Sequence, residues 1–186
     1  MVKPDTLPVK ERMSREMLLP LLADHVLQHG LAGVSLRPLA KAAGTSDRML
    51  LYHFGSKDAL LAELLKYLAD LYAQSLDAVF PSEPAASRKD TVVQVVRTTR
   101  TPPFAPFMRL WWELVAGASG GNEHYRASAQ AMMDQLLGWL EQHMPIDDPD
   151  PVGGARRMFT IIEGALMMDA VGRSEIADAG IAAGEL

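Results

Sequence analysis

The sequence predicts an all-α protein of about nine helices. Apolar residues recur at helical spacing along most of the chain, for example at Leu60, Leu64 and Leu68. Glycines and prolines interrupt these runs where helices would end, and no segment shows the apolar–polar alternation of a strand. The chain has 186 residues, of which 48% are hydrophobic, so it is able to bury a sizeable core.

The first four expected helices have clear start and stop signals. Each begins at a serine whose side chain is able to accept a bond from a free backbone N–H, and the first three end at a glycine. The serines are Ser14, Ser35, Ser46 and Ser56, and the glycines are Gly30, Gly44 and Gly55. The expected apolar stripe of the first helix is Leu18, Leu21, Leu22 and Val26. The stripe of the fourth helix continues past Leu68 as far as Phe80, where Pro81 begins a break.

Breaks rich in proline and glycine divide the second half of the chain. They fall at residues 101–103, 119–121 and 145–154. The last of them is expected to be a surface loop because it holds three prolines and three aspartates. The expected helices therefore cover residues 14–30, 35–44, 45–55, 56–80, 87–101, 103–118, 123–144, 154–172 and a weaker segment from Ser174 onward.

Charge is distributed unevenly along the chain. The net charge is −5, but residues 1–66 hold nine Lys and Arg against seven Asp and Glu, whereas residues 67–186 hold nine against sixteen. A front unit that binds phosphate is compatible with this pattern despite the acidic total. The chain has no cysteine and no apolar run of the roughly 20 residues that span a bilayer. We therefore expect a cytoplasmic protein without disulfides, thiol catalysis or a membrane segment.

Residues 35–58 carry the most informative pattern. They predict two short helices that join at Gly44, with the small residues Ala40 and Ala43 where the helices cross closely. This arrangement is a helix-turn-helix, whose second helix enters the major groove of DNA. The residues expected to contact DNA lie on or beside that helix and are Arg37, Thr45, Ser46, Asp47, Arg48, Met49, Tyr52, His53 and Lys57.

These side chains suit different contacts with DNA. Arg48 is the best candidate for reading a base, since a guanidinium bonds two acceptors of a guanine at once, and a phosphate or solvent contact is an equal alternative. Hydroxyl, imidazole and ammonium groups suit phosphate oxygens, and Lys57 also stands at a helix N-terminus, which favours an anion. The candidates for phosphate contacts are Thr45, Ser46, Tyr52, His53 and Lys57.

An ordered set of residues extends across positions 15–66. It comprises Gly30, Ser35, Leu39–Ala40, Ala43–Gly44–Thr45–Ser46, Leu50, His53–Phe54 and Ser56–Lys57–Asp58. In this set the chain resembles the DNA-binding domain of the TetR/AcrR family of transcriptional regulators. One departure is Leu51, because most members have a phosphate-contacting tyrosine directly after the position of Leu50, and here the tyrosine, Tyr52, comes one place later.

The resemblance implies a division of the chain into two domains. A three-helix helix-turn-helix DNA-binding domain with an N-terminal arm would occupy residues 1–58 and be joined by a long helix to a larger helical domain in residues 59–186, which would bind an effector and dimerise. Such a protein would be a ligand-responsive regulator, by family default a repressor, that binds a palindromic operator as a homodimer and is released by a small apolar effector. The alternative is a DNA-binding regulator or architectural protein without an effector.

Two sets of residues in the second domain are candidates for these roles. An aromatic and Met-rich set suits an effector pocket, with core packing as the alternative, and consists of Phe104, Phe107, Met108, Trp111, Trp112, Met132, Met133 and Met167. The resemblance implies that the last two helices form the dimer interface. Helix 154–172 supplies apolar surface for it from Phe159, Ile162, Ala165, Leu166 and Met168.

Charged residues of the chain give weaker signals. Four carboxylates would suit a cationic ligand if they were buried, although an exposed acidic surface explains them more simply; they are Glu113, Asp134, Glu163 and Asp169. His25 and His29 stand four apart but lack the adjacent carboxylate of a zinc protease motif, so we interpret them as surface histidines. No phosphate loop, nucleophile elbow or metal motif occurs, so we expect neither an enzyme nor a cofactor or metal site.

Overall fold

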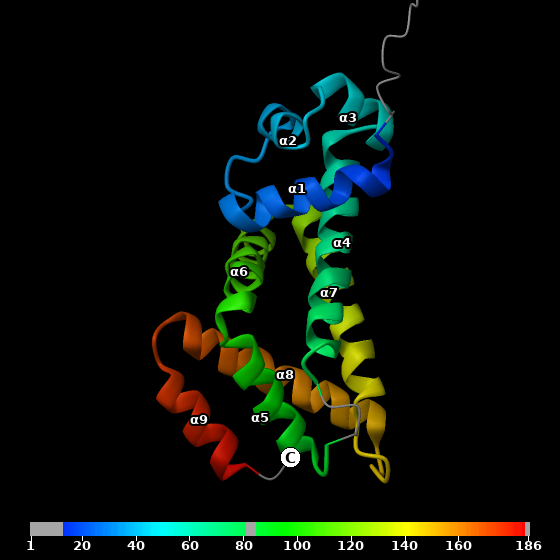
Figure 1. Ribbon diagram of the computed structural model, residues 1–186. Coiled ribbons are helices and arrows are strands. Elements are labelled where there is room, and N and C mark those ends of the chain that lie inside the picture. The colour runs from blue at the N-terminus through cyan, green and yellow to red at the C-terminus, as the bar shows by residue number, and fades with distance from the viewer. Residues whose placement is uncertain (1–12, 81–84, 185–186) are drawn as a thin grey trace, which may run out of the picture.

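The computed structural model describes residues 13–80 and 85–184, and every regular element in these residues is helical (Figure 1). The described residues form nine α-helices and one short 3₁₀ helix, which confirms the all-α prediction. The helices are α1 (Arg15–His29), α2 (Leu36–Ala42), α3 (Asp47–Phe54), α4 (Lys57–Asp77), α5 (Arg88–Thr99), η1 (Pro102–Phe104), α6 (Ala105–Ser119), α7 (Glu123–Gln142), α8 (Pro151–Ala170) and α9 (Ser174–Ala183). None of the described helices is long and apolar enough to cross a membrane.

Helices α1, α2 and α3 pack with the first half of α4 around the first of two apolar cores. In α1, Leu18, Leu22 and Val26 are fully buried. Leu21 of the predicted stripe is instead 43% exposed, because it lies about 100° around the helix from the centre of the buried face. The expected N-terminal arm, residues 1–12, lies outside the described residues.

Helix α4 spans both cores, and its predicted stripe is buried from Leu60 to Leu76. The stripe faces the first core as far as Leu68 and the second core from Tyr72 onward. Figure 1 shows α4 running from the end of the molecule that holds α1–α3 toward α8. The helix ends at Asp77, slightly earlier than predicted, and Phe80 follows in a turn, while the predicted break at Pro81 lies outside the described residues.

The second core lies among α5, α7, α8, α9 and the second half of α4. Helix α8 begins three residues earlier than predicted, at Pro151. Asp150 caps it by accepting a hydrogen bond from the Gly153 backbone N–H at 3.0 Å, and proline suits the first turn of a helix. The predicted surface loop before α8 is therefore shorter than its composition indicated.

Helix α6 connects the two cores. Its Leu110 and Leu114 are buried in the first core, while Phe107 and Met108 pack against both. The first core therefore continues beyond residue 58, since it takes in α4 as far as Leu68 and part of α6. The predicted division between residues 58 and 59 falls within the first turn of α4, and it stays a prediction.

Candidate nucleic-acid interface and ligand pocket

The turn between α2 and α3 has the hydrogen bonds of a Schellman cap. Gly44 has a φ of +64°, a left-handed conformation that favours glycine. Its N–H donates to the Lys41 carbonyl at 3.2 Å, and the Thr45 N–H donates to the Ala40 carbonyl at 2.9 Å. Ala40 and Ala43 are both 2% exposed, so the two helices approach closely at these small residues. These bonds fix the angle at which α3 leaves α2, as the predicted helix-turn-helix requires.

Helix α3 has one buried face and one free face. Leu50 is fully buried and Phe54 is 3% exposed, so both hold the helix against the first core. On the other side, Arg48 is exposed and Tyr52 is 75% exposed. The polar side chains of α3 are therefore available to an outside partner.

Two serines hold the starts of α3 and α4. Ser46 Oγ accepts a hydrogen bond from the Met49 backbone N–H at 3.3 Å, and Ser56 Oγ accepts one from the Ala59 N–H at 3.0 Å. The Ser46 hydroxyl acts here only as an acceptor, so its O–H remains able to donate to a phosphate oxygen. Lys57 is the exposed first residue of α4.

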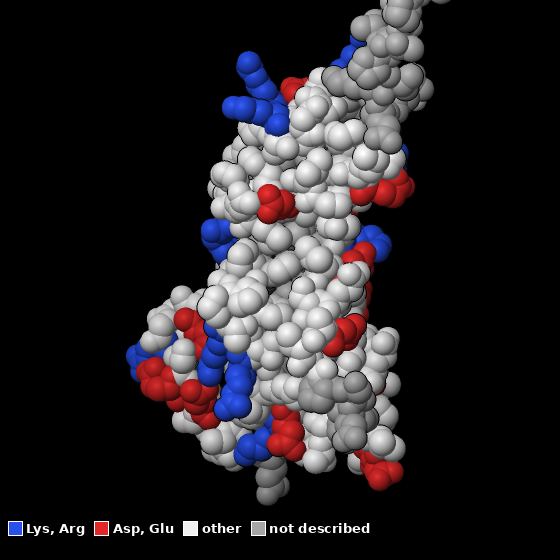
Figure 2. Space-filling model, in the orientation of Figure 1, with Lys and Arg blue, Asp and Glu red and all other residues white. Residues whose placement is uncertain are grey.

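All nine predicted DNA-contacting residues lie at one end of the folded molecule, in α2, α3, the turn between them and the start of α4. Seven of them are exposed, while Thr45 and His53 are half-buried. Figure 2 shows Lys and Arg side chains projecting from this end of the molecule. Their contacts with DNA stay predictions. Leu51, which departs from the family pattern, is 39% exposed beside the exposed Tyr52, so both side chains are open to solvent.

Helix α6 holds the end of α1 through two charged side chains. Arg109 Nη2 donates to the Leu27 carbonyl, one of the last carbonyls of α1. Glu113 Oε2 accepts hydrogen bonds from the backbone N–H groups of Leu31 at 2.5 Å and Ala32 at 3.1 Å. We call Arg109 and Glu113 the α6 clamp. No local pattern in the sequence indicates the α6 clamp, because its partners are backbone atoms about 80 residues away.

Gly30 is the residue that makes room for the α6 clamp. Its φ is +81°, and a β-carbon at this position would overlap the Glu113 carboxylate. Gly33, three residues later, also has a positive φ of +71° but faces open space. Gly30 thus ends α1, as predicted, and also lets Glu113 of α6 approach the backbone closely.

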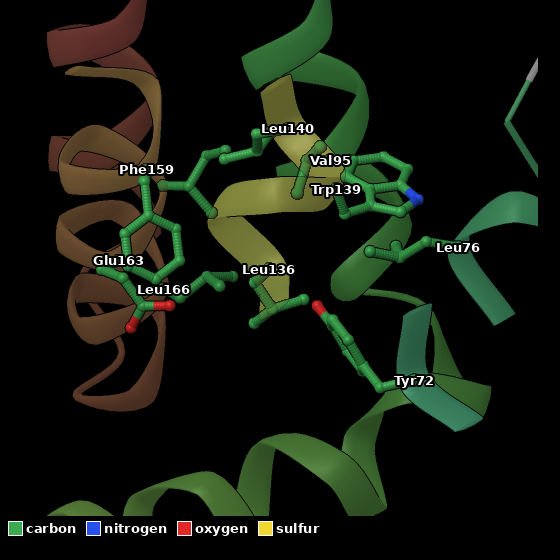
Figure 3. Close-up of a pocket in the computed structure, with 10 residues that line it drawn as sticks. Tyr72, Leu76, Val95, Leu136, Trp139, Leu140, Phe159, Glu163 and Leu166 are labelled. Carbon is green, nitrogen blue, oxygen red and sulfur yellow. The ribbon is translucent and has the colours of Figure 1, made fainter. Parts of the chain in front are cut away.

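Two apolar cavities meet near the middle of the second core. The α6 chamber is lined by Leu68, Tyr72, Phe107, Met108, Leu110, Trp111, Met132, Leu136, Glu163 and Leu166. The α5 chamber is lined by Tyr72, Leu76, Val95, Leu136, Trp139, Leu140, Phe159, Ile162, Glu163 and Leu166. Because they share four lining residues, we treat them as one two-chamber pocket. Figure 3 shows Tyr72 and Glu163 on opposite sides of Leu136.

The predicted pocket residues separate into two groups. Four of them line the α6 chamber, namely Phe107, Met108, Trp111 and Met132. The other four line neither chamber. Phe104 is buried with its ring 5.5 Å from that of Tyr72, Trp112 packs at both cores, and Met133 and Met167 are exposed. The predicted set did not include three aromatic residues that line the chambers, namely Tyr72 of α4, Trp139 of α7 and Phe159 of α8, of which Phe159 was assigned to the dimer interface.

The four carboxylates proposed for a cationic ligand have different surroundings. Glu113 belongs to the α6 clamp, Asp134 is exposed, and Asp169 pairs with Arg100 Nε at 2.8 Å. Only Glu163 lines the pocket. The sequence was unable to separate them because all four lie on apolar helices.

Two polar groups face the two-chamber pocket from opposite helices. Glu163 Oε2 accepts a hydrogen bond from Trp111 Nε1 at 3.0 Å, and burial raises the pKa of the Glu163 carboxyl. The Tyr72 hydroxyl lies 3.1 Å from the hydroxyl of Thr99, and burial raises the pKa of Tyr72 to about 12. The pocket is therefore apolar except for one carboxyl and one phenol.

The predicted dimer residues of α8 mostly face inward. Ile162, Ala165 and Leu166 are 4–5% exposed against the second core, and Phe159 is half-buried and lines the α5 chamber. Met168 is also half-buried and packs on that core. Ile162, Ala165 and Leu166 are occupied by the chain's own core, and a dimer interface at the five predicted residues stays a prediction. Other positions in and beside α8 and α9 face outward. Those positions include Gly164, Met167, Val171, Ile176 and Gly180.

His25 and His29 stack on each other on the outside of α1, with ring centroids 4.3 Å apart. His25 is half-buried and His29 is exposed. No group of three or more His, Asp or Glu side chains in residues 13–80 and 85–184 is arranged to hold a metal ion.

The helix-turn-helix end of the chain matches a known family. The model of the family described as bacterial regulatory proteins, tetR family, matches residues 25–64, which include α2, α3 and the start of α4. Over these residues the chain is similar to the TetR family of bacterial regulators, in agreement with the sequence resemblance. Its relatives are transcriptional regulators, in agreement with the prediction that the chain is not an enzyme.

Several individual regulators are similar to this chain. RutR of Escherichia coli K12 is 29% identical over 141 residues, which cover 72% of this chain and 66% of RutR, so the chain spans slightly less than two thirds of that relative. BetI of Rhizobium meliloti is 27% identical over 158 residues, covering 82% of this chain and 75% of BetI. Both are described as HTH-type transcriptional regulators.

Solved structures share the fold over nearly the whole chain. A transcriptional regulator from Streptomyces coelicolor A3(2) has a TM-score of 0.69 at 26% identity, covering 90% of this chain and 95% of its own. The multidrug binding protein EbrR, complexed with proflavin, has a TM-score of 0.67 at 21% identity, covering 92% of this chain and 98% of its own. At that identity EbrR is a neighbour in fold alone.

Proposed function

We propose that the chain is a ligand-responsive repressor that binds a palindromic operator as a homodimer and is released by a small apolar effector. The observation that carries this proposal is the free face of α3. Arg48 and Tyr52 are exposed there, while Leu50 and Phe54 hold the helix from behind. A helix held in this way is able to enter the major groove with its N-terminal side chains toward the base edges.

Arg48 is proposed to read a base and Lys57 to bind a phosphate. A guanidinium that bonds two acceptors of a guanine discriminates against other bases by roughly 1 to 3 kcal/mol. Lys57 lies at the start of α4, where unpaired backbone N–H groups also favour an anion. The other predicted contacts, from Arg37 to His53, would fix the register of the protein on the duplex.

A second copy of the chain is proposed to cover the outer side of α8 and α9. Met167 is 48% exposed, Val171 is 68% exposed and Ile176 is 44% exposed. Gly164 and Gly180 lie among these apolar residues and would allow two helix pairs to approach closely. A two-fold dimer would place two α3 helices on successive major grooves, which are about 34 to 36 Å apart.

Helix α6 is proposed to transmit the ligand signal. It carries Met108 and Trp111 in the wall of the α6 chamber and the α6 clamp on the end of α1. A ligand that repositions α6 would move α1 with it and change the spacing of the recognition helices. Release from DNA requires only that the ligand prefer that altered form.

The two-chamber pocket favours this regulator over an architectural DNA-binding protein without an effector. Its chambers are lined mostly by apolar and aromatic side chains with few polar groups, which is the usual composition of a ligand site. The neighbour in fold that was solved with proflavin supports the same interpretation. A cytoplasmic location would follow from the DNA-binding role.

Substitutions on α3 and α4 test the DNA-binding part of the proposal. Arg48→Ala is expected to relax the preference at one base position of the protein's preferred duplex, because a base contact is lost. Lys57→Ala is expected to weaken binding to all sequences about equally and to lower the slope of log affinity against log salt by about one. Fluorescence anisotropy with labelled duplexes at several salt concentrations measures both effects.

A matched control separates these contacts from the loss of any surface charge. Arg97 is an exposed arginine of α5, outside the proposed DNA and dimer surfaces, so Arg97→Ala should leave DNA affinity unchanged. If Arg48→Ala and Lys57→Ala also leave it unchanged, the assignment of the DNA interface is wrong.

A further inference from the structure

We infer that the two-chamber pocket takes an aromatic organic cation whose positive charge is balanced by the Glu163 carboxylate. This inference rests on the proposed ligand response and narrows the class of effector. Glu163 lies in the wall of both chambers, so a ligand in either one would meet its side chain.

The carboxylate of Glu163 is short of partners. It accepts one hydrogen bond, from Trp111 Nε1, whereas a carboxylate has room for about four. The other polar groups of the walls are occupied within the chain. The Tyr72 hydroxyl bonds with that of Thr99, and Trp139 Nε1 donates to Asp77 Oδ1 at 2.5 Å. Glu163 is therefore the group left to recognise a ligand.

No cation of the described residues neutralises Glu163. Other shielded carboxylates in the second half of the chain are paired with arginine, as Asp148 is with Arg88 at 2.6 Å and Asp169 with Arg100 at 2.8 Å. Residues 13–80 and 85–184 contain no ion pair that involves Glu163. A partly buried carboxylate without a cation is unfavourable for the empty protein, and the raised pKa of Glu163 agrees with this.

The shape and chemistry of the walls indicate what kind of cation would fit. The α6 chamber has the rings of Tyr72, Phe107 and Trp111 around it, and the α5 chamber has Trp139 and Phe159. Aromatic faces attract cations through their quadrupole, and they also pack well against a flat apolar ligand. A hydrated metal ion or a small ammonium would leave these apolar walls unused, and an anion would be repelled by Glu163.

Three probes of nearly the same size test the charge preference. They are 1-methylquinolinium, a permanent cation; 1-methylnaphthalene, its neutral isostere; and 1-naphthoate, an anion. Equilibrium dialysis against the full-length protein measures all three in the same way. We expect the cation to bind about tenfold or more tightly than the neutral isostere, which corresponds to about 1.4 kcal/mol, and the anion to bind most weakly.

Glu163→Gln and a matched control assign the preference to one residue. Glutamine keeps the acceptor for Trp111 and removes the charge, so the variant should lose the preference for the cation and still bind the neutral isostere. Asp134→Asn removes an exposed carboxylate from α7 outside the pocket and should keep the wild-type preference. In the wild type, affinity for 1-methylquinolinium should rise with pH as Glu163 ionises, and Glu163→Gln should abolish this dependence.

The outcomes separate this inference from the proposed function. Equal binding of the cation and its neutral isostere, or a preference that persists in Glu163→Gln, would overturn the cation assignment and leave the pocket as a site for neutral apolar ligands. If none of the probes binds, both the cation assignment and the ligand response are contradicted. DNA binding, measured separately, would still stand.

Discussion

The two ends of the molecule place their polar chemistry differently. Around α2 and α3, the core is filled by apolar side chains such as Leu50 and Phe54, and the polar residues face outward. In the second core, Tyr72 and Thr99 are buried, and Glu163 faces an internal cavity. The outward polar face of α3 suits the proposed contact with DNA, and the chambers beside Glu163 suit the proposed ligand. Helix α6 is shared by both ends, so a change in the enclosed site has a direct route to the surface site.

The first prediction concerns the packing of α3 against the first core. Phe54→Ala is expected to lower the free energy of unfolding by about 3 to 5 kcal/mol, because it leaves a cavity in the first core and frees α3. Urea denaturation followed by circular dichroism measures the loss. Tyr52→Ala, on the exposed face of the same helix, should change stability by no more than about 0.5 kcal/mol. Similar losses in the two variants would show that α3 is not oriented as described.

The fold and the surface end were largely predictable from the sequence because their signals are local. Serines at helix starts, glycines at helix ends and a stripe of leucines in α4 depend on residues within a few positions of each other, and the structure has helices at all of these places. Of the four serines, Ser46 and Ser56 make the capping hydrogen bond, whereas Ser14 and Ser35 do not. The start of α8 was missed because Asp150 and Pro151 suit both a loop and the first turn of a helix.

The pocket and the α6 clamp were only partly predictable because they depend on distant segments. Trp111 and Glu163 are 52 positions apart in the sequence. Glu113 accepts hydrogen bonds from backbone N–H groups more than 80 positions away. The predicted interface residues of α8, three of which are buried in the second core, show a related difficulty. Helical spacing shows that Ile162 and Leu166 share a face, but it does not show whether that face meets its own chain or another.

The second prediction tests the contact between α6 and the end of α1 with two glycine substitutions. Gly30→Ala and Gly33→Ala both place a side chain at positive φ, which costs roughly 1 to 2 kcal/mol. Gly30→Ala should cost about 1 to 3 kcal/mol more, because its β-carbon displaces Glu113 from the N–H groups of Leu31 and Ala32. The measurements are the free energies of unfolding and the hydrogen exchange of these two amides.

Glu113→Ala provides the control for the glycine pair. Once the carboxylate is absent, Gly30→Ala should cost less than it does in the wild-type background, whereas the cost of Gly33→Ala should stay the same. An equal cost of Gly30→Ala in the two backgrounds would mean that its clash with the α6 clamp contributes nothing to stability.

The third prediction, with the smallest expected effect, concerns how the stability of the protein depends on pH through Glu163. Because the pKa of Glu163 is raised in the folded state, its protonated form stabilises the protein at low pH, and this stabilisation is lost as pH rises through the raised pKa. Glu163→Gln does not titrate, so near neutral pH it should unfold at a higher temperature than the wild type. Thermal unfolding across a pH series should show this gap closing in acid, and a gap that widens in acid would contradict the burial of Glu163.

The most direct test of the account is selection of bound DNA from a random duplex pool, followed by titration of the selected site at several salt concentrations. Two α3 helices related by a two-fold axis predict a site with two symmetric half-sites about 10 to 10.5 base pairs apart and an affinity that falls steeply with salt. Weak binding without a preferred sequence would contradict the central claim that the free face of α3 reads DNA.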